Sequence, residues 1–146
     1  MGLFQKLLGN NHSVNKKASD DVLLLHSLML MAGADGVIED SEIMALQGFV
    51  NTLPEFRGKD VGSLFDQARK VASRFKDMRD SVKALAEIES ESVRKKCFIL
   101  AVDMAYASGD VDQSEEELLE AMQRVLNIPD DLARKILEVF SLKYAT

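Results

Sequence analysis

The 146-residue sequence contains no tryptophan, one cysteine, two prolines and only two threonines. A single cysteine cannot form an internal disulfide, and its isolation fits a reducing compartment. Alternating apolar and polar residues are also scarce, which disfavours an all-β sandwich or barrel. No hydrophobic run approaches the roughly 20 residues of a transmembrane helix. We therefore expect a soluble cytoplasmic protein.

Charge is abundant but unevenly distributed. The net charge of −6 argues against a dedicated nucleic-acid-binding protein, and 47 % hydrophobic residues exclude wholesale disorder. Residues 57–96 hold 11 basic and 7 acidic side chains, whereas the segments on either side are acidic. This basic middle either contacts phosphate or an anionic membrane, or consists of ordinary solvated helix faces. The sequence leaves both interpretations open.

Apolar residues recur with helical spacing along most of the chain, which predicts an all-α fold with about seven helices and no strands. The first predicted helix begins at Ser19 or Asp20 and is apolar nearly all round, so it should be central to the core. Residues 1–18 instead predict a short amphipathic N-terminal turn followed by a flexible linker. Residues 19–146 then form one helical domain.

An internal repeat is the most informative feature of the sequence. A shift of 73 residues aligns 31–42 with 104–115, and six of the twelve pairs are identical. Each copy consists of an apolar helix, an acidic loop with a glycine, and a second helix. The repeat predicts a compact bundle built from two pseudo-symmetric helical hairpins.

Much of this repeated motif has a purely structural interpretation. Gly36 and Gly109 allow the positive φ that often follows a helix end. An apolar residue inside each loop, Val111 in the second copy, is expected to anchor the loop in the core. Ser41 and Ser114 are predicted to cap the helices that follow.

The number of carboxylates adds a second interpretation, because like charges this close repel unless a cation lies between them. Oxygen ligands suit a hard divalent cation such as calcium or magnesium. One loop offers too few ligands, so we expect a shared site. The predicted metal ligands are Asp35, Glu39, Glu42, Asp110, Asp112 and Glu115.

The first loop reproduces only the second half of an EF-hand, from Asp35 through Gly36 to Glu42. Where an EF-hand needs acidic residues earlier in the loop, this chain has Met31 and Gly33. The second copy has the same deficiency. We therefore reject a working EF-hand in either loop.

Paired Asp-Gly-x-hydrophobic-x-x-x-Glu motifs in an all-helical domain of this size resemble the TerB tellurite-resistance family. The resemblance covers roughly residues 20–140. It implies a compact, cytoplasmic, non-enzymatic bacterial domain in tellurite and chemical-stress resistance, with acidic residues that hold a metal ion and partners at the inner membrane face. Ser108 departs from the family pattern, which usually has aspartate there. The matched positions are Asp35, Gly36, Glu39, Glu42, Gly109, Asp112 and Glu115.

Nothing in the sequence predicts an enzyme or identifies a small-molecule substrate. His26 and Cys97 have no partner at catalytic or zinc-ligand spacing, and we expect both to be packing residues. Two functions remain. The first is an ion-binding stress-response domain that uses the two acidic loops. The alternative is a metal-independent adaptor module that docks on a membrane-associated protein partner.

Overall fold

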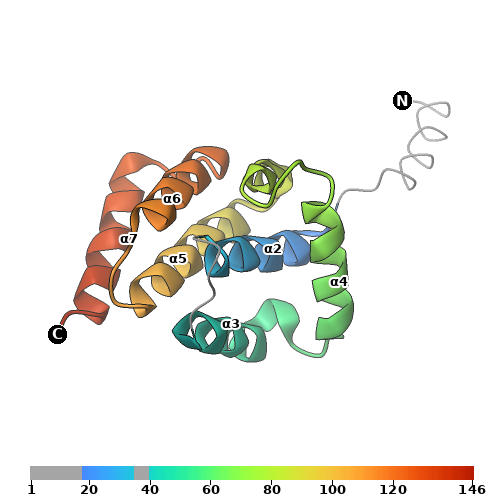
Figure 1. Ribbon diagram of the computed structural model, residues 1–146, viewed down its shortest axis with the longest axis horizontal. Coiled ribbons are helices and arrows are strands. Elements are labelled where there is room, and N and C mark those ends of the chain that lie inside the picture. The colour runs from blue at the N-terminus through green and yellow to red at the C-terminus, as the bar shows by residue number, and fades with distance from the viewer. Residues whose placement is uncertain (1–17, 35–39) are drawn as a thin grey trace, which may run out of the picture.

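The computed structural model describes residues 18–34 and 40–146, and within them the protein is entirely helical (Figure 1). The predicted all-α class is confirmed. The predicted N-terminal turn and part of the first loop lie outside these residues, so the expected division at residue 18 stays a prediction. The described elements are α2 (Asp20–Ala32), α3 (Asp40–Thr52), η1 (Pro54–Phe56), α4 (Val61–Ala72), η2 (Asp80–Glu87), α5 (Glu91–Ala107), α6 (Gln113–Val125) and α7 (Asp130–Lys143).

Helix α2 occupies the centre of the core, as its apolar sequence predicts. The Ser19 side chain caps it by accepting a hydrogen bond from the Val22 amide at 3.3 Å. From Val22 to Leu25 no side chain is exposed to solvent. The helix can be apolar on every side because α4, α5 and η2 all pack against it.

The two predicted hairpins are present and lie side by side. The first copy is α2 followed by α3, and the second is α5 followed by α6. Figure 1 shows α2 and α5 together in the middle of the molecule, with α4 at one end and α7 at the other. Helix α4 packs on α2 as α7 packs on α5, so the correspondence extends beyond the sequence repeat.

Residues 80–87 form the 3₁₀ helix η2. Two expected helix caps need correction. Ser114 does not cap α6, because that helix begins one residue earlier and Asp112 is its cap. Aspartate caps as well as serine does, and a glutamate three residues later completes the cap. Ser41 likewise lies inside the first turn of α3.

No helix among residues 18–34 and 40–146 combines the length and the apolar character that crossing a membrane requires.

Candidate functional site

The second acidic loop joins α5 to α6 through a sharp turn at Gly109. Its φ of +100° is in the region that glycine adopts readily, as the sequence predicts. The Ser108 hydroxyl donates a hydrogen bond to the Ala105 carbonyl oxygen at 2.9 Å and closes the end of α5. Val111 is half-buried against the core, so it anchors the loop as expected.

Asp112 and Glu115 form a reciprocal cap at the start of α6. The Glu115 amide donates to Asp112 Oδ1 at 2.8 Å, and the Asp112 amide donates to Glu115 Oε1 at 3.1 Å. Two amides that the helix itself leaves unpaired are satisfied in this way. Two of the predicted metal ligands therefore have an established structural role.

Glu42 and Glu115 occupy equivalent positions in the two copies. Each is the third residue of its helix, and their exposed fractions are 3 % and 4 %. A buried carboxylate is costly unless it is paired or hydrogen-bonded. The dipole of the helix N-terminus favours negative charge in this first turn. The two copies therefore share the burial of this carboxylate as well as its position in the sequence.

The predicted ligand set is only partly within the described residues. Asp35 and Glu39 lie outside them, and Asp110 is exposed on the second loop. Within the part of the chain that the structure describes, no three Asp, Glu, His or Cys side chains are grouped so that they could hold a metal ion. A complete cation site would therefore need donors from residues 35–39.

Arg79 links the ends of both loops, and the sequence did not single it out from the other basic residues. Its guanidinium donates to the Ala34 carbonyl oxygen at 3.4 Å, beside the first loop. It also donates to the Ser114 carbonyl oxygen at 3.4 Å and to Glu117 Oε1 at 3.3 Å, beside the second loop. A positive charge from the segment between the two copies is thus held near both loops.

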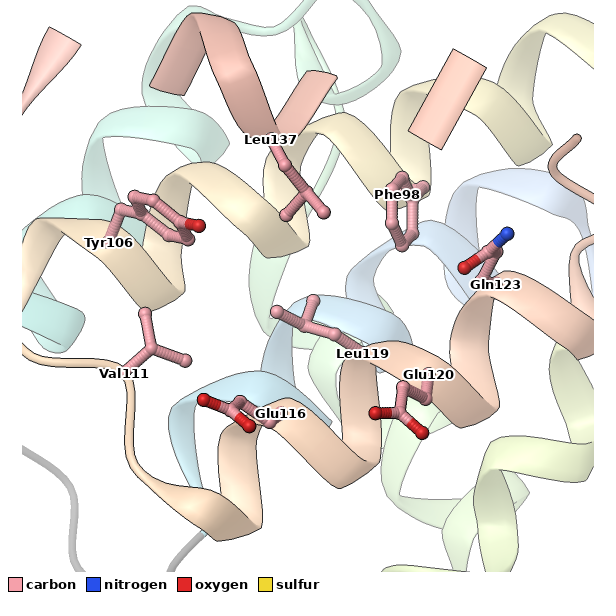
Figure 2. Close-up of a pocket in the computed structure, with 8 residues that line it drawn as sticks. All are labelled: Phe98, Tyr106, Val111, Glu116, Leu119, Glu120, Gln123 and Leu137. Atoms are coloured by element: carbon pink, nitrogen blue, oxygen red, sulfur yellow. The ribbon is translucent and has the colours of Figure 1, made fainter. Parts of the chain in front are cut away.

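A hollow of about 280 Å³ lies beside the second loop, between α5, α6 and α7. Figure 2 shows Val111 and Leu119 facing into it, with Glu116 and Glu120 on the α6 side. Phe98 is almost completely buried at its base. The lining contains carboxylates but no histidine, cysteine or serine. The hollow therefore offers apolar contact and negative charge.

His26 and Cys97 are both fully buried. Burial raises the pKa of the Cys97 thiol to about 12, so the thiol is protonated and inert at neutral pH. Burial also lowers the pKa of His26, whose Nε2 lies 3.1 Å from the Ser81 carbonyl oxygen. Both side chains act as packing residues, as the sequence predicts.

Comparison with known proteins gives one family. Residues 21–137 match the family model described as tellurite resistance protein TerB. The match begins in the first turn of α2 and extends into α7, so it includes both loops. No curated protein and no solved structure matches the chain significantly.

Proposed function

The chain belongs to the TerB tellurite-resistance family, and we propose that it is a non-enzymatic stress-response domain whose two acidic loops bind one divalent cation. Calcium and magnesium are the candidates, because both prefer oxygen ligands. The proposed ligands come from both copies of the repeat. They are Asp35, Glu39 and Glu42 in the first copy, and Asp110, Asp112 and Glu115 in the second.

The observation that supports this proposal is the repeated burial of Glu42 and Glu115 beside loops that Arg79 holds to one another. The capping role of Asp112 and Glu115 is compatible with it. An ionised carboxylate has two oxygens with about four lone-pair sites, so it can accept an amide hydrogen bond and also bind a cation.

Thermal unfolding with chelator and with millimolar calcium or magnesium tests the proposal. A cation at about 100 times its dissociation constant stabilises the fold by roughly 2.7 kcal/mol. For a domain of this size that raises the melting temperature by about 5–10 °C. The variant Glu115→Gln should keep the cap, because glutamine can accept the same amide hydrogen bond. It should lose most of the cation-induced shift.

Glu138→Gln is the matched control, because it removes the same charge from an exposed position on α7. It should leave the cation-induced shift unchanged. If wild type shows no shift with either cation, or if both glutamine variants lose it equally, the loops serve as helix caps and the metal proposal is wrong.

A metal-independent adaptor is the second candidate, and exposed apolar side chains support it. Ile43 and Met44 are exposed neighbours on α3, and Val139 and Leu142, three residues apart on α7, are exposed together. Exposed apolar side chains that lie together are typical of surfaces that bind a protein partner. If the N-terminal residues reach a membrane-associated partner, deleting residues 1–18 should abolish recovery in the membrane fraction. The fold and the cation response should not change. Unchanged recovery in that fraction would contradict this form of the adaptor.

A further inference from the structure

Helix α3 is much less buried than α6, its counterpart in the second copy. Glu42 is the only buried residue of α3, whereas α6 buries Leu118, Leu119 and Met122 in addition to Glu115. The difference has a structural cause. Helix α6 packs against the eight-residue 3₁₀ helix η2, whereas the 3₁₀ helix that contacts α3 is η1, which has only three residues. Apolar residues of α3 therefore remain at the surface, with Ile43 at 40 % exposure.

These residues form one wall of a groove of about 370 Å³ between α3 and α4. Ile43, Leu46 and Val50 line it from α3, and Val61 and Phe65 line it from α4. Its polar side chains are neutral amides, and no charged residue lines it. The groove therefore suits an uncharged apolar segment.

The chain itself supplies such a segment within reach. Residues 1–8 contain Leu3, Phe4, Leu7 and Leu8, a spacing that places all four on one side of a helix. The described chain starts at Ala18, which lines one hollow together with Lys70, Val71 and Arg74, near the C-terminal end of α4.

The connecting residues are long enough to reach the groove. Phe65 lies about 9 Å along the α4 axis from Val71, at 1.5 Å per residue, and about a third of a turn around the helix. The path along and around α4 is on the order of 20 Å, given a helix diameter of about 10–12 Å. Residues 9–17 span up to about 30 Å when extended.

We propose that residues 1–8 dock in the groove between α3 and α4 of the same chain, with their leucine and phenylalanine side chains against Ile43, Val50 and Phe65. Tethering through a short linker gives a local concentration in the millimolar range. A contact whose dissociation constant is below this local concentration is then mostly occupied within one molecule. Docking would cover the apolar surface of α3, and it does not depend on a bound cation.

A spin label on residue 5 of the full chain tests this proposal. Cys97 is completely buried, so a Gln5→Cys variant is labelled at the introduced thiol alone. Docking predicts strong paramagnetic broadening of the Ile43, Val50 and Val61 methyl resonances. Phe4→Ser should abolish this broadening, and because it changes none of the core residues of the described chain, it tests the contact separately from the fold.

Ile43→Gln should also abolish the broadening at Val50 and Val61. The control is Leu142→Gln, which makes the same kind of apolar-to-amide change at an exposed position on α7, away from the groove, and should leave the broadening intact. Absence of broadening at the groove would overturn the proposal. A mixture of chains that carry only the isotope label with chains that carry only the spin label reports contacts between molecules alone. Broadening of the groove resonances in that mixture, as strong as in the doubly labelled chain, would also overturn the proposal, because the occupant would then be a second copy.

Discussion

At the scale of single residues, His26 illustrates how burial couples a side chain to pH. Its imidazole is completely buried, and desolvation lowers its pKa below 6.5, with Arg74 adding to the effect. As the pH falls, the unfolded chain therefore binds a proton before the folded one does. The contribution of neutral His26 to the free energy of unfolding is therefore fully present above about pH 6.5. Below that pH it decreases by up to about 1.4 kcal/mol per pH unit.

Replacing His26 with glutamine should flatten this dependence of the free energy of unfolding on pH below about pH 6.5. Urea unfolding at several pH values measures it. His12→Gln, in the predicted linker, is the control and should retain the wild-type slope. An unchanged slope in His26→Gln would mean that another group causes the loss of stability.

Single residues also show where sequence reasoning succeeds. The roles of Cys97 and Gly109 could be predicted, because an apolar helix face or a helix end decides them locally. The sequence predicts Ser114 as the cap of α6, although Asp112, two positions earlier, is an equally good capping residue. Asp112 is the cap because Glu115, three residues beyond it, completes the reciprocal hydrogen bonds. Arg79 could not be predicted, because its partners are 35 to 45 residues away in the chain.

At the scale of elements, replacing glycine with alanine should have opposite effects on stability at Gly48 and at Gly109. Gly48 lies inside α3 with open space around its Cα, so Gly48→Ala should stabilise the helix by about 0.5–1 kcal/mol. Gly109 also has open space but adopts a φ of +100°. Gly109→Ala should therefore cost roughly 1–2 kcal/mol through backbone strain alone.

Chemical denaturation of the two variants tests both predictions, a higher free energy of unfolding for Gly48→Ala and a lower one for Gly109→Ala. The two variants are comparable because each adds a single methyl group. Destabilisation by Gly48→Ala would indicate that α3 is covered by another part of the protein. A neutral Gly109→Ala would indicate that the loop can relax its backbone.

Helix type was harder to predict than helix position. Residues 80–87 show helical spacing of buried residues, with Val82, Ala84 and Leu85 inward. The spacing does not distinguish a 3₁₀ helix from a short α-helix, because packing of the segment against α2 and α6 decides its winding. The acidic loops pose the same difficulty, since a repeat in sequence does not reveal which carboxylates serve as caps.

At the scale of the whole molecule, a polar contact fastens the end of α7 to the core. Asp103 on α5 is 8 % exposed and accepts hydrogen bonds from the Tyr144 hydroxyl and from Lys143 Nζ, the latter at 3.1 Å. Hydrogen bonds to an ionised carboxylate are stronger than neutral ones. Tyr144→Phe should therefore lower the free energy of unfolding by roughly 1–2 kcal/mol.

Equilibrium unfolding in urea measures this loss. Tyr106→Phe is the control, because the Tyr106 hydroxyl makes no hydrogen bond within the described residues, and it should change stability by much less. Equal effects of the two variants would mean that Asp103 does not depend on Tyr144.

Arg79 has a consequence for how the duplicated chain unfolds. It belongs to neither hairpin, yet its hydrogen bonds join the end of α2 to the start of α6. Helices α2 and α5 also bury their apolar sides against each other. Neither half can therefore lose its structure without exposing the other, so the repeats should melt as one cooperative unit. The calorimetric enthalpy of unfolding should equal the van't Hoff enthalpy, whereas independent halves would give a calorimetric value about twice as large.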